Sequence, residues 1–389
     1  MDSDVFSQLI STLDRFVAEK LRPRERETAE NDSVAADIIK SMREIGLFGL
    51  AIPEEFGGLG LSLSEEVQVM FVLGGTSPAF RSVIGTNNGI GSQGIIIDGT
   101  PEQKQHYLPR MAAGELIGSF CLTEPGAGSD AGSVRTSATR DGEHYALNGT
   151  KRFITNAPQA GIFTVFARTD ASSKTASGVS AFLVEADTPG ISLGKKDKKM
   201  GQHGAHICDV IFDNARVPVG AIIGGEANVG KGFTTAMKVL DRGRLTIAAV
   251  CVGVAERLIA DSLRYAMERK QFGQPIAEFQ LVQAMLADMR TEAFAARCMV
   301  EETARRFDAK ANIATESACC KMFASEMVGR VADKAVQIHG GAGYLEEYGI
   351  ERFYRDVRLF RIYEGTTQIQ QLVIARNMVR DAASGRLRH

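Results

Sequence analysis

The sequence has no tryptophan, almost no net charge and no long apolar run among its 389 residues. The lack of tryptophan excludes nothing. The formal charge is 45 − 47 = −2, which disfavours a general nucleic-acid binder, because such proteins usually carry a concentrated basic surface. No apolar run approaches the roughly 18 residues that span a bilayer. The N-terminus also lacks the regions of a secretory signal, so we expect a cytoplasmic chain without an integral membrane segment.

Metal-binding patterns are missing as well. The six cysteines include no CxxC pair, and the six histidines include no HExxH pattern. His203 and His206 lie close together in a glycine-rich loop, but no third ligand is evident. We therefore expect no metal centre. Adjacent Cys319 and Cys320 are poorly placed for a structural disulfide, which fits a reducing compartment.

The order of element types predicts three domains in an α+β, mainly α fold. Residues 1–118 read as an N-terminal helical domain, with a capping-box pair at Ser62 and Glu65. Residues 119–225 hold short β-rich runs between turn residues, which predicts a middle antiparallel β-barrel or sandwich. Residues 226–389 show long helical patterns with almost no proline, which predicts a C-terminal four-helix bundle. The strands and helices do not alternate, so a doubly wound nucleotide domain is not expected.

Two glycine-rich segments and one basic cluster are weak signals of nucleotide binding. GAGSDA at 126–131 fits the loose dinucleotide pattern, but another strand follows it in place of a helix. GEANVGKG at 225–232 ends in glycine, so it lacks the hydroxyl that a phosphate-binding loop uses on Mg²⁺. We interpret both segments as connections. Four lysines between 195 and 199 fit a solvated loop, with a phosphate-facing role as the alternative.

Two further motifs carry candidate chemistry. FCLTEPGAGSD at 120–130 combines hydroxyls with glycines that expose backbone N–H groups, and such a turn can hold an anionic or amide-rich ring. RIYEGTTQIQ at 361–370 places a single carboxylate, Glu364, before a pair of threonines. Taken alone, the first is an ordinary hairpin loop and the second holds an exposed loop acid, which is the usual place for glutamate.

Together with four other segments, these motifs resemble the acyl-CoA dehydrogenase family. The further segments are KRFITN at 151–156, RKQFGQPIAEFQ at 269–280, QIHGGAGYLEEY at 337–348 and QLVIARNM at 371–378. All six occur in the family's order, and the resemblance covers about residues 5–380. It implies a FAD-dependent enzyme that oxidises an acyl-CoA thioester to a trans-2-enoyl-CoA.

The resemblance also implies where FAD binds. Arg269 and Gln280 match positions that commonly reach FAD from a neighbouring subunit. The residues that match flavin contacts are Phe120, Leu122, Thr123, Ser129, Phe153, Ile154, Thr155, Arg269, Gln280, Gln337, Gly340, Gly341, Thr366 and Gln368.

Glu364 matches the family's catalytic base. Its role would be to remove the pro-R α-proton while the β-hydrogen leaves as hydride to flavin N5. The backbone N–H of Glu364, with a ribityl hydroxyl, would polarise the thioester carbonyl. Burial should raise the carboxyl pKa. In isovaleryl- and long-chain-type members the base stands elsewhere, at the position of Gly243 here, and glycine cannot act as a base.

Substrate contacts are implied at Ser129, Asp241, Arg244 and Gly365. An alternative interpretation of Asp241 and Arg244 is a helix salt bridge, since they stand three residues apart. Many members carry Arg where His203 stands and Thr where Ile207 stands, which leaves coenzyme A handling open there. The base placement favours short-chain, medium-chain or branched short acyl groups, in fatty-acid β-oxidation.

The expected partners are an acyl-CoA, an electron-transfer flavoprotein and further copies of the chain in a homotetramer. No nucleic acid is expected. Two alternatives stay open at this stage. One is an acyl-CoA oxidase or another flavin oxidase that uses O₂ on the same fold. The other is a flavin-free helical interaction protein, which the long methionine-faced helices permit.

Overall fold

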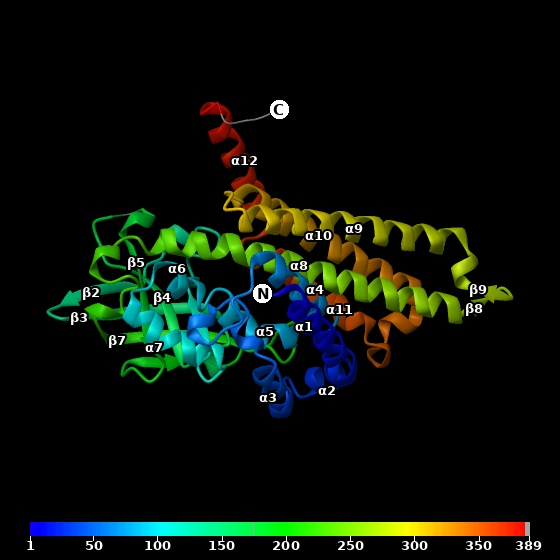
Figure 1. Ribbon diagram of the computed structural model, residues 1–389, viewed down its shortest axis with the longest axis horizontal. Helices are drawn as coiled ribbons and strands as arrows, with labels where there is room; N and C mark the ends of the chain where they lie inside the picture. The colour runs from blue at the N-terminus through cyan, green and yellow to red at the C-terminus, as the bar shows by residue number, and fades with distance from the viewer. Residues whose placement is uncertain (174, 386–389) are drawn as a thin grey trace.

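The computed structural model describes residues 1–173 and 175–385. Its first part is helical (Figure 1). The capping box predicted at Ser62 and Glu65 is confirmed at the start of the fourth helix. The side chain of each residue accepts a hydrogen bond from the backbone N–H of the other. The helices of this part are α1 (Ser3–Phe16), α2 (Glu25–Glu30), α3 (Ala36–Glu44), α4 (Leu63–Gly74), α5 (Pro78–Asn88), α6 (Gln93–Asp98) and α7 (Pro101–Ala112).

A curled sheet follows, in the order β1-β4-β2-β3-β7-β6 with β5 beside β4. Its strands are β1 (Gly118–Cys121), β2 (Ser137–Asp141), β3 (His144–Thr155), β4 (Ile162–Arg168), β5 (Val179–Glu185), β6 (Ile191–Leu193) and β7 (Ile207–Pro218). Most pairs are antiparallel, as predicted, but β1 and β2 each pair with β4 in parallel. The sheet is therefore mixed, because β1 enters it directly from the helical part beside a strand of the same direction.

The remaining chain forms the bundle that lies to the right in Figure 1. A short hairpin, β8 (Lys270–Gln271) and β9 (Gln274–Pro275), stands at its far end, and α12 projects away from it. The helices are α8 (Gly232–Glu268), α9 (Gln280–Asp308), α10 (Ala314–His339), α11 (Ile350–Val357) and α12 (Thr367–Ala383).

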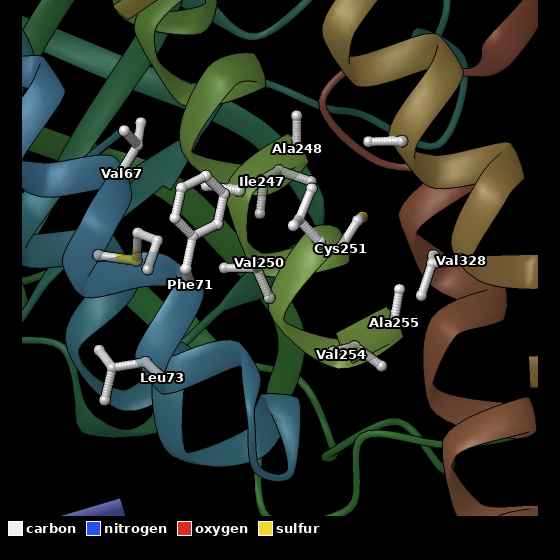
Figure 2. Packing of buried hydrophobic residues seen from close by; sticks show 14 of the residues in the cluster. Val67, Phe71, Leu73, Ile247, Ala248, Val250, Cys251, Val254, Ala255 and Val328 are labelled. Atoms are coloured by element: carbon white, nitrogen blue, oxygen red, sulfur yellow. The ribbon is translucent and has the colours of Figure 1, made fainter. Parts of the chain in front are cut away.

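Helix α8 is the centre of the packing. It lies between α4 and α10, and Figure 2 shows Phe71 of α4 and Val328 of α10 on opposite sides of it. Gly74 and Gly253 allow α4 and α8 to approach closely, since a Cβ at Gly253 would lie 2.2 Å from the Phe71 carbonyl oxygen. Helix α8 begins beside the sheet, where Ala236 packs with sheet residues, and it continues into the core of the helical bundle. It therefore contributes to both hydrophobic cores.

The fold class predicted from the sequence is confirmed. In α9, Met289 is fully buried, whereas Phe294 is 57% exposed. Within residues 1–173 and 175–385, no helix is long and apolar enough to cross a membrane. The same ranges hold no cluster of three metal-ligating side chains.

Candidate active site

A cavity of about 490 Å³ lies where α5, β1, β3, α8 and the start of α12 meet. Ten of the sequence-predicted site residues line it, although more than 240 positions separate the first from the last. They are Phe120, Leu122, Thr123, Ser129, Phe153, Ile154, Thr155, Arg244, Glu364 and Gly365.

A buried ion pair between Lys151 and Glu124 holds the turn after β1 in place. Lys151 of β3 donates from Nζ to the Leu122 carbonyl at 3.1 Å and to Glu124 Oε1 at 2.7 Å. Glu124 also accepts the backbone N–H groups of Arg135 and Thr136. Burial alone would raise the pKa of Glu124, but Lys151 and these donors outweigh it and lower the pKa. The carboxylate therefore stays charged and fixes Leu122 and Thr123 at the cavity wall.

The same wall presents a flat, accessible surface. Phe153 has a positive φ of 60° and is 56% exposed, with the Arg152 guanidinium 4.6 Å from its ring centre. Left-handed backbone is uncommon for an aromatic residue and is often found at functional sites. A Cβ placed on Gly126 or Gly128 would meet nothing within 4 Å, so their backbone can be approached closely. This wall suits a planar ring.

Glu364 stands opposite in a strained backbone position. Its φ is +53°, and Gly365 follows with a φ of +91°. Lys321 of α10 donates from Nζ to the Gly365 carbonyl at 2.6 Å, and Gln370 donates from Nε2 to the Glu364 carbonyl at 2.9 Å. These two hydrogen bonds hold the turn in place, and strained backbone conformations persist where the surrounding structure fixes them in this way. Thr366 caps α12 immediately afterwards.

The Glu364 carboxyl group itself has no partner. Its Oε2 atom is buried and forms no hydrogen bond within the described residues. Burial raises the pKa of Glu364, and the cations Arg81, Lys321 and Arg244 only partly offset the shift. The direction agrees with the expectation from the sequence. An unpaired buried carboxylate with a raised pKa is suited to accept a proton.

Arg244 and Asp241 form the helix salt bridge that their spacing allowed. Arg244 donates to Asp241 Oδ1 at 2.6 Å across one turn of α8, and Arg244 also lines the cavity. Burial raises the pKa of Asp241, and Arg244 opposes that shift. Asp241 is not among the lining residues. Its structural effect is therefore to orient Arg244.

The second group of predicted flavin residues lies far from this cavity. Arg269, Gly340 and Gly341 line another cavity, of about 510 Å³, at the far end of the bundle. Gln280 and Gln337 are exposed. Gln368 is exposed too, but it stands in the first turn of α12, between Gly365 and Ile369 of the first cavity. Arg269 follows Arg244 by 25 residues along α8, which is about 38 Å at roughly 1.5 Å per helical residue. One chain therefore does not bring the two groups together.

Sequence reasoning missed several residues of the cavity. Arg81 and Lys199 line it, and Lys321 and Gln370 hold the Glu364 turn. Lys199 belongs to the lysine cluster that was interpreted as a solvated loop. It lies in a loop and is half-buried at the cavity wall, so the phosphate-facing alternative stays open for this residue. Ile207 also lines the cavity, whereas His203 contacts the Lys199 carbonyl at 3.2 Å. Buried lysines have no distinctive spacing, and only the fold locates them.

The geometry places a carboxyl oxygen without a hydrogen-bond partner among the described residues beside a cavity of about 490 Å³. Comparison with known proteins gives the family. Sequence models of the acyl-CoA dehydrogenase N-terminal, middle and C-terminal domains match residues 4–115, 119–215 and 230–379. The chain belongs to the acyl-CoA dehydrogenase family, and it is a FAD-dependent oxidoreductase of that family.

Full-length relatives include enzymes named as reductases. The acryloyl-CoA reductase (NADH) of Anaerotignum propionicum is 43% identical over 96% of this chain and 94% of its own length. The CarC subunit of the caffeyl-CoA reductase-Etf complex of Acetobacterium woodii is 41% identical over 95% and 97%. An acyl-CoA dehydrogenase from Bacillus anthracis, solved with FAD, superimposes with a TM-score of 0.91 at 35% identity, covering 100% of this chain and 69% of that one.

The residues present fit FAD. The open backbone at Gly128, the exposed Phe153 ring and the residues Thr123 and Ser129, which carry hydroxyls, line the cavity. The partnerless Glu364 Oε2 faces the same space from the other side. A flavin ring against the β wall would leave room for a thioester between the ring and the carboxyl group.

Proposed function

We propose that the protein catalyses α,β-dehydrogenation of an acyl-CoA thioester to a trans-2-enoyl-CoA, with Glu364 as the base. The observation that carries the proposal is the buried, unpaired Glu364 carboxyl group at the wall of the cavity. When bound, FAD supplies the acceptor for the β-hydrogen, which leaves as a hydride.

The residues of the chain perform the remaining tasks. Glu364 Oε2 takes the α-proton, and a positioned base of this kind contributes about 10²–10⁴-fold in rate. The Glu364 backbone N–H polarises the thioester carbonyl, since a fixed donor stabilises the developing enolate oxygen. Arg244, Gly365 and Ser129 line the cavity and would contact the thioester. Lys321 and Gln370 keep the base in place through the carbonyls of its turn.

We also propose that neighbouring subunits complete each flavin site. Phe120, Leu122, Thr123, Ser129, Phe153, Ile154 and Thr155 would hold the ring in one chain. Gln337, Gly340, Gly341, Arg269 and Gln280 of another chain would hold the rest, with Thr366 and Gln368 beside them. The distance along α8 supports this, as do large exposed apolar side chains: Phe272 is 94%, Leu281 82% and Val379 71% exposed. A homotetramer is the expected assembly, and light scattering of the FAD-loaded protein would measure it.

The electron partner is proposed to be an electron-transfer flavoprotein, supported by the Etf complex that contains one relative. Because relatives are named as reductases, the reverse reaction is a second candidate, in which a 2-enoyl-CoA is reduced. The same base position serves both directions, since Glu364 would then return a proton to the α-carbon. An oxidase reaction would instead produce peroxide directly from O₂.

The test is an anaerobic titration of the FAD-loaded protein with acyl-CoAs of 4 to 16 carbons, followed at about 450 nm, where the oxidised cofactor absorbs. Bleaching that is lost in Glu364→Gln supports dehydrogenation and its base. Recovery of the band with a 2-enoyl-CoA after chemical reduction tests the reverse direction. Absence of bleaching with every thioester would contradict the proposal.

A further inference from the structure

Arg81 is a cation in the active-site cavity without a hydrogen-bond or ion-pair partner in the part of the chain that the structure describes. It stands on α5 and lines the cavity with Ser82 and Gly85 of the same helix. Its Nε atom is buried and has no hydrogen-bond acceptor among the described residues. No ion pair of Arg81 exists there either, although ion pairs of other arginines are numerous. Arg81 as a whole is half-buried, and a guanidinium whose buried N–H finds no acceptor is costly, so its retention needs a reason.

Besides Arg81, two cations lower the pKa of the Glu364 carboxyl group, and both have partners within the described residues. Lys321 donates to the Gly365 carbonyl at 2.6 Å, and Arg244 is paired with Asp241 at 2.6 Å. Lys199 and Arg376 also line the cavity but are not among the charges that shift this pKa. The acidic residues that line the cavity are Glu364 and Asp130. Asp130 is exposed and accepts a hydrogen bond from Ser133, and neither acid lies within 4.0 Å of Arg81 as an ion pair. Arg81 therefore stands ready for an anion that the chain itself does not supply.

The backbone of α5 makes room for this guanidinium. A Cβ at Gly85, one turn after Arg81, would lie 2.8 Å from Arg81 Nη1. The side chain thus lies along its own helix, over Gly85, and reaches the cavity. Arg81 and Glu364 line the same cavity, and of the cations that lower the pKa of Glu364 and of Tyr363, Arg81 has the largest effect on both. The guanidinium is therefore close to the base.

Closeness to Glu364 decides which part of an acyl-CoA could supply the anion. Glu364 must contact the α-carbon, which is next to the thioester. The phosphates of coenzyme A lie many bonds away from that carbon, on the other side of the sulfur. An anion near both Arg81 and Glu364 therefore belongs to the acyl chain, a few carbons beyond the α-carbon.

We propose that the substrate is a short ω-carboxyacyl-CoA, the monothioester of a dicarboxylic acid, whose free carboxylate binds Arg81. The proposal rests on the function proposed above and names its substrate class. Arginine suits this task, because its planar fork binds a carboxylate through two parallel hydrogen bonds. Arg81 is thus a specificity-determining residue, and the proton still goes to Glu364. Neutral chains of equal length would leave the guanidinium unpaired.

The experiment compares two series of thioesters in the FAD-loaded enzyme. Succinyl-, glutaryl- and adipyl-CoA are set against butyryl-, valeryl- and hexanoyl-CoA, with anaerobic bleaching as the kinetic readout. Calorimetry with inert thioethers, 4-carboxybutyl-CoA and pentyl-CoA, gives dissociation constants that do not depend on turnover. The variants are Arg81→Met, Arg81→Lys and, as a matched control, Arg15→Met, which replaces an exposed arginine of α1.

We expect the wild type to prefer one ω-carboxyl chain length over its neutral counterpart by roughly 10²-fold or more in kcat/KM, as expected for a desolvated charge pair. Arg81→Met should abolish that preference and keep turnover of neutral chains, which also shows that the variant folds. Arg81→Lys should retain part of it, and Arg15→Met all of it.

Two outcomes would overturn the inference in distinguishable ways. If neutral acyl-CoAs bleach the flavin and Arg81→Met leaves the ratio between the two series unchanged, the carboxylate site is wrong and the dehydrogenase function stands. If no thioester of either series bleaches the flavin or binds, the function on which the inference rests fails as well.

Discussion

The carboxyl group of Glu364 lies directly against Gly243 of α8, in the space that a side chain at position 243 would fill. A Cβ on Gly243 of α8 would lie 2.6 Å from Glu364 Oε2, well inside van der Waals contact. Sequence comparison with the family places an alternative base at the position of Gly243, and the structure gives the physical reason why one base excludes the other. A side chain at 243 and a carboxyl group from 364 cannot both point at the same atom of a substrate.

Replacing Glu364 with glutamine should remove the base and keep its shape. We expect kcat to fall by about 10²–10⁴-fold, the usual contribution of a positioned base, with FAD still bound. Stopped-flow bleaching under anaerobic conditions measures it. Glu115→Gln, which changes an exposed glutamate, should behave as wild type. A Glu364→Gln variant with near-normal turnover would place the base elsewhere.

The same substitution should increase stability at neutral pH. Burial raises the pKa of Glu364, so the folded state holds a proton that the unfolded state releases. The stability contributed by this group is therefore highest below the unfolded pKa and declines as pH rises through the folded pKa. Glutamine has no such decline. Thermal unfolding at pH 5 and pH 8 should show a Tm gain for Glu364→Gln that is larger at pH 8, and equal gains would contradict the assignment.

Gly243→Ala should disturb the base without removing it. The added methyl group would meet Oε2, and a displacement of about 1 Å can cost roughly 10²-fold in rate. We expect kcat to fall and FAD content to stay unchanged. Gly220→Ala is the control, because a Cβ there meets nothing within 4 Å. Unchanged kcat would mean that Glu364 can turn away from α8 at no cost.

Lys321→Met should loosen the turn that holds Glu364. Its hydrogen bond to the Gly365 carbonyl disappears, and we expect kcat to drop more than KM changes. Burial lowers the pKa of Lys321 to about 8, so its folded state releases a proton that the unfolded state keeps between about pH 8 and 10. Wild-type stability should therefore gain with pH across that window.

Methionine removes this pH-dependent gain, which a thermal melt at pH 7 and pH 9.5 would detect. Lys20→Met, at an exposed position, should keep it. If the two variants show the same pH dependence, Lys321 is not the group that titrates.

Asp356→Asn tests how the loop beside the cavity is held. Asp356 accepts the backbone N–H of Gln202, and Gln202 lines the cavity. Burial raises the pKa of Asp356 to about 6, so its contribution to stability falls as pH rises through about 6. The asparagine variant should hold this loop equally well, and its stability should not fall as pH rises through about 6. Urea unfolding at pH 4.5 and pH 7.5 checks the difference, and a parallel loss in both proteins would reject it.

Much of the site could be predicted from the sequence because its motifs are local. FCLTEPGAGSD and KRFITN supply residues of the cavity wall formed by the sheet, and RIYEGTTQIQ supplies the candidate base, since each needs a fixed turn that only certain residues permit. The order of a helical, a β and a second helical domain follows from the spacing of apolar residues, and the capping box at Ser62 and Glu65 marks the start of a helix. Even Gly243 was informative, because a missing side chain is visible in the sequence.

The sequence by itself determined the fold class, the family resemblance and the candidate base, because these depend on local patterns and their order. Tertiary structure alone decided which charges meet. Arg81, Lys321 and Glu364 lie on three elements far apart in the chain. Lys151 bonds to Glu124 across 27 positions and fixes the turn after β1. Tertiary structure also separated Arg269 from the cavity by the length of α8. The physical reason is that burial and pairing of charges depend on distances in space, which a linear pattern does not contain.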